Sequence, residues 1–433
     1  MKDVIRNRWT KFAIWALLYL AWVVWMGSWW WLLGLIVIFD IFITRKVHWN
    51  FWKKRYKPGE KHSAANDWLD TIIFVIIVVP LINIFLFQAF KIPSSSMERT
   101  LYTGDHLFVS KLTYGPRIPE TPLTIPFTHN TIFGKESYST LIQNKYRRLK
   151  GFREVRRGDC VVFGFPNGDT VLRNAPAEDY YALVRMLGRE TVQGLGEIVV
   201  RPTDKKDHYV KRCVALPGDT LEVRDGLVWV NGRQQETYPG IQLSYCVRTS
   251  GQRINSKILE DIGLNPSEQF FDPMLPGYPV MLLTAGMLDE VKALSNVVEV
   301  TDNLDRNPEA CSLEIFPFTP DSGWTRDYYG PLWIPSKGST VKLTEENLPL
   351  YERIISVYEK SDLQEALRNG EYTFKQDYYF MMGDNRHNSL DSRYWGFVPE
   401  DHIVGKPVVI WLSTDKSQKF PKNIRWDRFL KFL

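Results

Sequence analysis

Apolar residues are concentrated in two long stretches near the start of the chain. The first covers residues 12–43 and contains one charge, Asp40; the second covers residues 71–90 and contains none. A helix rises about 1.5 Å per residue and the hydrocarbon core of a bilayer is about 30 Å thick, so the second stretch has the length of one membrane span. The first stretch is too long for one straight span, and Gly27-Ser28 offers a break that would divide it into a helical pair.

Beyond residue 100 the pattern changes to short runs in which apolar and polar residues alternate, as they do in half-buried strands. Four of these runs follow a Gly that precedes Asp or Ser: Gly104-Asp105, Gly158-Asp159, Gly218-Asp219 and Gly338-Ser339. Asp225-Gly226 and Asn231-Gly232 favour type I′ hairpin turns. Helical periodicity is best at 344–368. The pattern predicts a mostly β domain with inserted loops.

Charge divides the chain in a similar place. Residues 1–61 carry 11 basic and 3 acidic residues, a balance of +8, whereas the remainder has a balance of −3. Because the net charge of this remainder is so close to zero, we do not expect nucleic acid as a partner. The basic segment 45–61 between the apolar stretches is expected to stay in the cytoplasm. Residues 91–433 then lie outside, whether the first stretch crosses the membrane once or as a helical pair. We therefore expect residues 1–90 to be an anchor in contact with membrane lipid.

Four cysteines show no C-x-x-C motif and no metal-ligand spacing, so we expect no metal and no other cofactor. Buried free thiols are the favoured interpretation. If a disulfide forms, Cys246 with Cys311 is the preferred pair, because Cys160 and Cys213 lie inside apolar strand patterns.

Two segments could together supply a nucleophile and a base. Directly after the second apolar stretch come three consecutive serines, Ser94, Ser95 and Ser96. Far along the chain, Lys211 interrupts a strand-like stretch. If this side chain points inward, burial lowers the pKa of its ammonium group, and a neutral amine can accept a proton from a serine hydroxyl.

A third segment, residues 383–396, is dense in turn-forming and charged residues, which indicates an ordered loop. Asp391 and Arg393 could form an ion pair that holds this loop. Ser389 could hydrogen-bond the amine of Lys211.

Together with residues 157–163, these three segments resemble the sequence motifs of bacterial type I signal peptidases, in their order and in their position behind a membrane span. Each motif is weak alone, and only the combination is specific. The resemblance implies a membrane-anchored serine protease with a mostly β catalytic domain. It further implies removal of signal peptides from exported preproteins, with cleavage after small residues at −1 and −3. The implied location is the bacterial inner (plasma) membrane, multi-pass, with the catalytic domain on the outer face.

The resemblance also assigns roles to individual residues. Ser96 would be the nucleophile and Lys211 the general base. The Ser96 N–H and the Ser94 hydroxyl would form the oxyanion hole, and support for the lysine would come from Ser389, Asp391 and Arg393. The positions that line the small-residue pockets are matched by Phe90, Ile92, Pro93, Tyr209 and Val210.

The chain departs from the family pattern at several places. Arg99 stands where the family usually has Pro, which is expected to alter the turn after the nucleophile. His387 stands where the family usually has Asp, which puts the charge balance of that loop in doubt. Long segments near 120–150, 164–208 and 233–376 lie outside the resemblance and are interpreted as insertions without an assigned function.

Other interpretations stay open. The chain could be an inactive membrane-anchored β scaffold that binds exported chains. A Ser-His-Asp protease could use His208 or His387. Archaeal and eukaryotic signal peptidases have a His at the position of the base. In this chain Lys211 occupies that position, so no histidine is needed there and His208 is expected to be a surface residue. Ser339 and Ser413 each have Lys three residues on, as in penicillin-binding transpeptidases, but no S-D-N or K-T-G motif follows.

Overall fold

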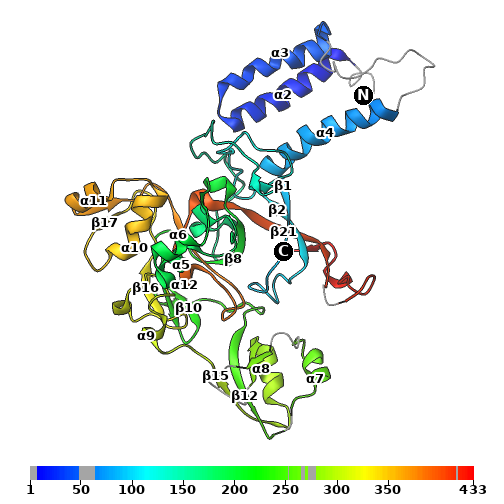
Figure 1. The fold of residues 1–433 in the computed structure, drawn as a ribbon. Coiled ribbons are helices and arrows are strands. Elements are labelled where there is room, and N and C mark those ends of the chain that lie inside the picture. The colour runs from blue at the N-terminus through cyan, green and yellow to red at the C-terminus, as the bar shows by residue number, and fades with distance from the viewer. Residues whose placement is uncertain (1–6, 48–63, 252, 265–268, 272–278, 416–417) are drawn as a thin grey trace.

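The computed structural model describes residues 7–47, 64–251, 253–264, 269–271, 279–415 and 418–433. A group of apolar helices at the N-terminal end stands beside a larger body that is built mainly of strands (Figure 1). Most of the basic segment predicted at 45–61 lies outside the described residues.

The first apolar stretch folds as two helical limbs. Helix α2 (Arg8–Met26) ends at Gly27, whose φ of 59° is the left-handed conformation that glycine adopts easily. The chain then returns through a 3₁₀ turn, helix α3 (Gly34–Phe39) and a π-helical segment (Asp40–Thr44). The rings of Phe12 and Phe39 lie 5.4 Å apart across the two limbs. The predicted break at Gly27-Ser28 and the helical pair are therefore confirmed.

The second apolar stretch differs from the prediction at its end. Helix α4 covers Ala64–Phe85, and residues 87–91 form strand β1 (Phe87–Lys91) instead of a last helical turn. This strand pairs with β2 (Asp105–Ser110), and that pairing overrides the apolar character of the segment. Within the described part of the chain, two helices, Arg8–Met26 and Asp67–Phe85, are long and apolar enough to cross a membrane, and Trp29–Thr44 is a shorter apolar helix.

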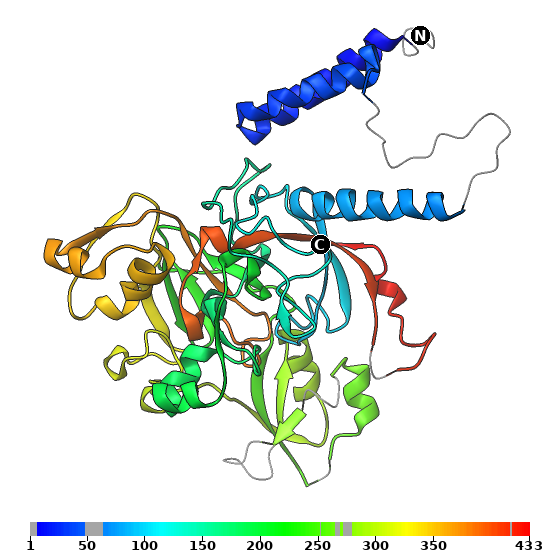
Figure 2. The same ribbon diagram turned by 45° about the horizontal axis from the view of Figure 1, so that its top comes forward.

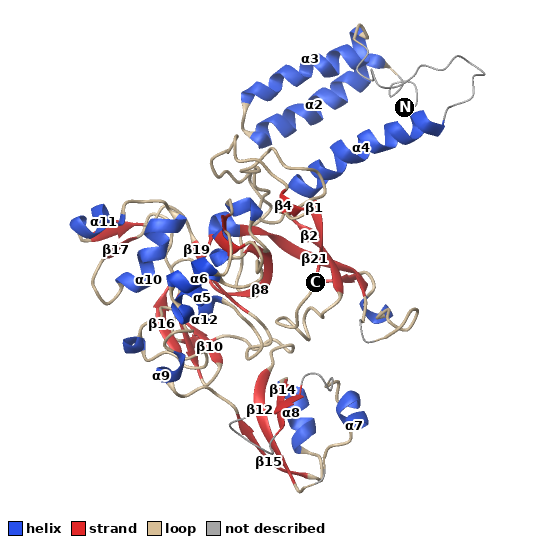
Figure 3. Ribbon diagram, in the orientation of Figure 1, coloured by secondary structure: helices blue, strands red, loops and turns tan. Residues whose placement is uncertain are grey.

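The central structure is a curled antiparallel sheet of eight strands (Figure 3). Its order is β1-β2-β21-β5-β8-β19-β20, and β22 pairs with β21. The strands beyond β2 are β5 (Cys160–Gly164), β8 (His208–Ala215), β19 (Tyr378–Met382), β20 (Val398–Pro399), β21 (Ile403–Ser413) and β22 (Lys431–Phe432). This order brings the segment after α4 and the middle of the chain into one sheet.

A second sheet of four strands contains the two predicted hairpins. Its strands are β9 (Thr220–Arg224), β10 (Leu227–Val230), β11 (Arg233–Gln234) and β16 (Tyr329–Trp333). Asp225 and Gly226 have φ of 52° and 73°, and Asn231 and Gly232 have φ of 53° and 75°. Positive φ at both central residues is the requirement of a type I′ turn, so both hairpin predictions are confirmed.

Residues 242–303 form a separate small unit, which we call the inserted subdomain. It contains the strands β12 (Leu243–Thr249), β13 (Gln269–Phe271), β14 (Pro279–Leu283) and β15 (Val297–Asp302), with the helices α7 (Ser256–Asp261) and α8 (Ala285–Lys292). It has its own apolar core, in which Val247, Leu264 and Val291 are fully buried. In Figures 1 and 2 it lies at the opposite end of the body from the N-terminal helices.

The remaining elements are short. They are β3 (Thr131–Ile132), β4 (Lys135–Glu136), β6 (Thr170–Leu172), β7 (Ile198–Val200), β17 (Thr340–Lys342), β18 (Glu371–Thr373), α5 (Tyr180–Leu187), α6 (Arg189–Gly194), α9 (Pro308–Cys311), α10 (Leu348–Arg353), α11 (Leu363–Asn369) and α12 (Ser392–Trp395). The predicted helix at 344–368 is thus correct in type but not continuous. It contains α10, a π-helical segment and α11, and Asp362 begins α11 by accepting hydrogen bonds from Gln364 and Glu365.

None of the four cysteines takes part in a disulfide. The preferred pairing of Cys246 with Cys311 is therefore wrong: Cys246 lies in β12, while Cys311 ends α9 and donates from its Sγ to Asp305 Oδ2 at 3.2 Å. Burial is the main cause that raises the pKa of Cys311 to about 12, so this thiol stays protonated.

Candidate active site

The serine segment forms a tight turn between β1 and β2. Glu98 N–H donates to Ser95 O at 3.0 Å, and Leu101 N–H donates to Met97 O at 2.7 Å. Met97 and Leu101 are fully buried and pack with Leu107 in the apolar core under the turn. Because these two side chains anchor the turn from below, Ser96 is held at the surface of the core, partly buried.

Lys211 lies in the middle of β8 and is buried, which is the condition that the sequence analysis set for a lowered pKa. Its neighbours across the sheet are Val161 on β5 and the strand β19, and only 4% of the residue is exposed. Its Nζ is hydrogen-bonded to Ser96 Oγ. The fold therefore brings together a serine and a lysine that are 115 residues apart in sequence.

Burial lowers the pKa of the Lys211 ammonium from 10.5 to about 8. The charge of Asp391 opposes this change, and the charge of Arg393 adds to it. A lysine with this pKa is partly neutral near neutral pH, and its lone pair can then accept the Ser96 proton.

The loop 383–391 packs against the serine turn and is held by buried ion pairs. Asp391 binds Arg393 at 2.8 Å and accepts the Gly383 N–H at 3.0 Å, so the predicted ion pair is present. Asp384 binds Arg212 at 2.5 Å, and both residues are buried. The sequence offered no signal for this second pair, since its partners lie 172 residues apart.

Two asparagines of this loop contact the serine turn directly. Asn385 N–H donates to Ser96 O at 3.1 Å, and its side chain donates to Ser95 O at 3.2 Å. The Asn388 side chain donates to Ser95 Oγ at 2.9 Å. These contacts fix the backbone of the turn, and the sequence analysis did not single out either asparagine.

Ser389 lies beside this turn but does not form the expected hydrogen bond with Lys211. It is 7% exposed, and its hydroxyl has no hydrogen-bond partner among the described residues. A Cβ atom placed on Gly383 would lie 2.2 Å from Ser389 Oγ and 2.6 Å from Ser96 O. Only glycine therefore allows the loop, Ser389 and the serine turn to approach so closely.

A cleft of about 360 Å³ opens over Ser96 and Lys211. All five residues that the sequence analysis assigned to substrate binding line it, namely Phe90, Ile92, Pro93, Tyr209 and Val210. Ser94 lines it as well and is exposed. The lining further includes residues that the sequence analysis did not assign to it, among them Leu107, Val162, His208, Asn388 and Leu390. The cleft is mostly apolar, which suits small aliphatic side chains and keeps Lys211 away from water.

His208 is not the surface residue that the sequence predicted. It lies in β8, is partly buried, and packs its ring 5.2 Å from Phe90 and 4.5 Å from His129. No hydrogen bond joins it to Ser96 among the described residues, whereas Lys211 has one. The arrangement thus favours the lysine over a histidine as the partner of the serine.

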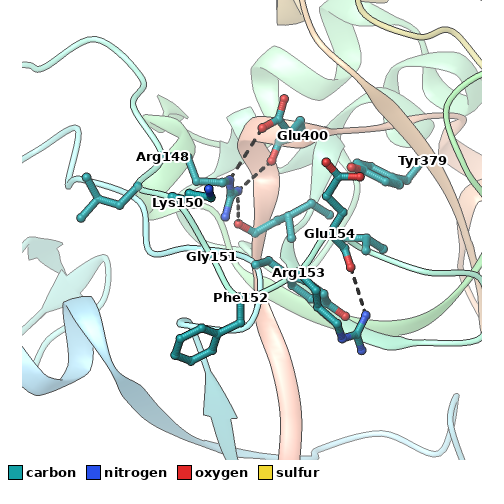
Figure 4. Close-up of a pocket in the computed structure, with 12 residues that line it drawn as sticks. Arg148, Lys150, Gly151, Phe152, Arg153, Glu154, Tyr379 and Glu400 are labelled. Atoms are coloured by element: carbon teal, nitrogen blue, oxygen red, sulfur yellow. Dashed lines mark hydrogen bonds and ion pairs between the residues drawn. The ribbon is translucent and has the colours of Figure 1, made fainter. Parts of the chain in front are cut away.

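A second cavity, of about 510 Å³, lies beside the segment 148–155 (Figure 4). Its arginines already have partners. Arg148 donates to the backbone oxygens of Glu400 and Ile403 at 2.9 and 2.6 Å, and Arg153 binds Asp159 at 2.7 Å. None of the predicted site residues lines this cavity. No group of three or more His, Cys, Asp or Glu side chains that could hold a metal occurs within the described residues.

Comparison with known proteins identifies the family. Residues 65–257 and 336–412 match the family model described as "Signal peptidase, peptidase S26". The chain belongs to the S26 family of signal peptidases.

Several curated relatives are named signal peptidase I. The protein of Haemophilus influenzae is 26% identical over 376 residues, which cover 86% of this chain and 76% of its own length. That of Buchnera aphidicola subsp. Acyrthosiphon pisum is 24% identical over 383 residues, with coverages of 88% and 85%. That of Helicobacter pylori is 24% identical over 393 residues, with coverages of 86% and 92%.

The matched regions leave out residues 258–335, which include most of the inserted subdomain. The backbone of this subdomain binds the loop 383–391. Gln242 N–H donates to Asp384 O at 2.8 Å and Gln242 O accepts the Arg386 N–H at 2.9 Å. Gln242 is fully buried. The insertion is thus built into the site and is not a distant appendage.

His387, which stands where the S26 pattern usually has Asp, is bound by one residue from outside the matched regions, Asp327, and by one within them, Ser244. Its Nε2 donates to Asp327 Oδ1 at 2.7 Å, and its Nδ1 accepts the Ser244 N–H at 2.9 Å. An Nδ1 that accepts a hydrogen bond carries no proton, so the ring is neutral. Burial lowers the pKa of His387, in agreement with this state. The negative charge that the loop lacks at this position is supplied by the fully buried Asp327.

Arg99, the other departure from the S26 pattern, has a φ of 70°. Proline is restricted to a φ of about −65°, so the turn after Ser96 has a shape that the usual proline could not adopt. The Arg99 side chain donates to Gly263 O of the inserted subdomain at 2.6 Å. The φ of Arg99 agrees with the expectation that this substitution alters the turn.

Proposed function

We propose that this protein is a serine endopeptidase that removes signal peptides from exported preproteins, with Ser96 as nucleophile and Lys211 as general base. The hydrogen bond between Ser96 Oγ and Lys211 Nζ at the base of an apolar cleft carries the proposal. Membership of the S26 family and the relatives named signal peptidase I support the substrate class.

The chemistry follows from the two side chains. The neutral amine of Lys211 takes the Ser96 proton as Oγ attacks the carbonyl carbon of the scissile peptide. The resulting ammonium then gives that proton to the leaving amine, and an acyl-enzyme ester remains on Ser96. A water molecule, deprotonated by the same amine, hydrolyses the ester and restores the serine.

The developing oxyanion needs donors, and the turn supplies two. The Ser96 N–H and the Ser94 hydroxyl donate to no other group within the described residues, and Ser94 faces the cleft. A donor aimed at the oxyanion typically contributes about 3–4 kcal/mol to transition-state stabilisation. Ser389, Asp391 and Arg393 support the lysine by shaping its surroundings.

The walls of the cleft explain the expected preference for small side chains. Phe90, Ile92 and Val210 pack with one another in the core under the serine turn, and Pro93 and Tyr209 complete the lining. We propose that alanine-sized side chains at positions −1 and −3 of a signal peptide bind against these walls.

The anchor and its orientation are also part of the proposal. Residues 1–90 would hold the enzyme in the bacterial inner membrane through α4 and the α2–α3 pair, and residues 91–433 would lie on the outer face, with the insertions near 120–150, 164–208 and 233–376. The two helices long enough to cross a membrane and the cationic balance of residues 1–61 support this topology.

A cleavage assay with an Ala-x-Ala preprotein in detergent tests the proposal. Ser96→Ala should reduce kcat/KM on the order of 10⁴-fold or more, because it removes the attacking oxygen. Ser95→Ala is a matched control, since Ser95 lies next to Ser96 and its hydroxyl, among the described residues, only accepts a hydrogen bond from Asn388. Equal activity of both variants and the unaltered protein would rule out Ser96. Binding of the preprotein without any cleavage would favour the inactive scaffold.

A further inference from the structure

A third cavity, of about 510 Å³, lies between α4 and the segment 117–129. Much of its lining is apolar. The side chains come from the second half of α4 and from the facing segment, and include Ile76, Pro80, Ile84, Ile118, Ile125 and Phe127. Ile125 and Phe127 remain 47% and 61% exposed, so these walls are not closed by other parts of the described protein.

The other end of this cavity is cationic. Lys111, Arg117 and Lys205 all line it. Lys111 N–H donates to Leu86 O at 2.9 Å, which places Lys111 directly at the end of α4. The ammonium group of Lys111 has no hydrogen bond and no ion pair with any described residue. Burial, Arg117 and Lys205 together lower the pKa of Lys111 to about 7.

The neighbouring cations, Lys205 and Arg117, form no ion pair with a carboxylate among the described residues. Lys205 is 7% exposed and faces the ring of Tyr138 at 5.6 Å, and Arg117 donates to Asp401 O at 2.6 Å. The charge of Asp204 favours the charged form of both cations, but it is one negative charge beside two positive ones. A buried cation without a counter-ion is costly, so such a group favours an anion from outside the chain.

Two carboxylates, Glu120 and Asp204, also line the cavity but do not neutralise Lys111. Asp204 Oδ2 accepts the N–H and the hydroxyl of Thr121 at 3.0 and 2.9 Å. Burial and the charge of Asp204 raise the pKa of Glu120 to about 7, so this group is only partly ionised near neutral pH. The net charge at the polar end of the cavity therefore remains positive.

We propose that this cavity binds one phospholipid, with the phosphate at Lys111, Arg117 and Lys205 and one acyl chain along α4. Ile76 and Ile84 are separated by about 12 Å along the helix axis, which offers an apolar track for a chain. A phosphodiester carries one negative charge and several acceptor oxygens, which match three adjacent cations. Because α4 contains one of the two candidate spans, lipid would be available at this position.

Lipid binding in this cavity would be a property separate from the proposed cleavage and independent of the roles of Ser96 and Lys211. It does have a consequence for the cleft. His208 lines both this cavity and the cleft over Ser96. The bound lipid would therefore pack against the wall that the substrate contacts on its other side.

Native mass spectrometry of the full chain in detergent tests the proposal with three probes. Phosphatidylglycerol should bind with a stoichiometry of one. Diacylglycerol with the same chains and inorganic phosphate should each bind at least tenfold more weakly, because each lacks one half of the ligand. Tight binding of phosphate alone would show a free anion site, and equal binding of diacylglycerol would show a site without phosphate recognition. Either result overturns the proposal.

Variants at one position locate the site. Lys111→Glu should weaken phosphatidylglycerol binding at least tenfold. Lys111→Met should also weaken it, and this variant places no charge in the cavity that could hinder folding. Lys135→Glu is the matched control, since Lys135 is exposed on β4 and does not line the cavity. Cleavage of a soluble signal-peptide substrate would show that each variant is folded. Unchanged lipid binding in Lys111→Met, or an equal loss in Lys135→Glu, would refute the assignment.

Discussion

The titration of Lys211 should set the pH dependence of cleavage. Burial lowers the pKa of this lysine from 10.5 to about 8. A change of this size corresponds to about 3 kcal/mol between the two protonation states. At pH 7 about one amine in ten is then neutral, against about one in 3,000 for an unperturbed lysine. The cleft thus increases the fraction of usable base by roughly 300-fold before any contribution from geometry.

The assay is kcat/KM for an Ala-x-Ala preprotein between pH 6 and pH 10. The rate should rise about tenfold per pH unit at low pH and level off above about pH 8. Lys206 provides a matched control, because it is 3% exposed and burial also lowers its pKa to about 8. It lies outside the cleft and donates to Pro166 O at 3.0 Å. Lys206→Met should keep the inflection of the pH profile, whereas Lys211→Ala should abolish cleavage.

Three outcomes would contradict this reasoning. A rate that does not change between pH 6 and pH 8 would show that no group with this pKa acts as the base. Substantial activity of Lys211→Ala would show that the base is another residue. Loss of the inflection in Lys206→Met would show that the titrating group is Lys206 and not Lys211.

Three further changes test the surroundings of the site. Lys211→Met should raise the free energy of unfolding at pH 7 by up to about 3 kcal/mol, because it removes a group whose pKa is lowered by folding. That penalty is complete below about pH 8 and disappears as the pH rises past 10.5, so the gain measured by urea unfolding at pH 7 should fall below about 1 kcal/mol at pH 10; a loss at pH 7 would contradict it. Asp391→Asn should cost about 3–5 kcal/mol in the same experiment, since it leaves the Arg393 guanidinium buried without its carboxylate, and an unchanged transition midpoint would be inconsistent with that ion pair. His387→Ala should cost about 1–3 kcal/mol by leaving Asp327 without its donor, and His387→Asn should recover part of this loss if the hydrogen bond is the cause.

The pairing of Ser96 with Lys211 could be predicted only through the resemblance of several motifs to one family, because each residue is a weak signal alone. Three serines directly after an apolar stretch and a lysine within an apolar strand are local features, and the order of the motifs supplied the rest. Alternation also predicted the strands that follow Gly104, Gly158, Gly218 and Gly338, and the dipeptides Asp-Gly and Asn-Gly predicted the two type I′ turns, since both signals act over a few residues.

The sequence could not predict the features that depend on distant partners. Residues 87–91 are apolar enough to continue α4, and only pairing with β2 makes them a strand. Asp384 meets Arg212 across 172 residues, and Asp327 meets His387 across 60. No local periodicity encodes such pairs. The same reason explains why Ser389 was expected to bond the lysine, although the close packing at Gly383 holds it beside the serine turn instead.

The loop 383–391 also sets a time for the appearance of proteolytic activity during synthesis. Asn388 and Leu390 line the cleft, and Asn385 fixes the backbone of Ser96. At translation rates of roughly 5–20 residues per second, the loop emerges about 15–60 s after the serine turn. Throughout that interval the new polypeptide contains the serine and then the lysine but not the wall that completes their cleft. With the proposed roles of Ser96 and Lys211, the order of synthesis would delay cleavage by a nascent chain until its last strands have been made.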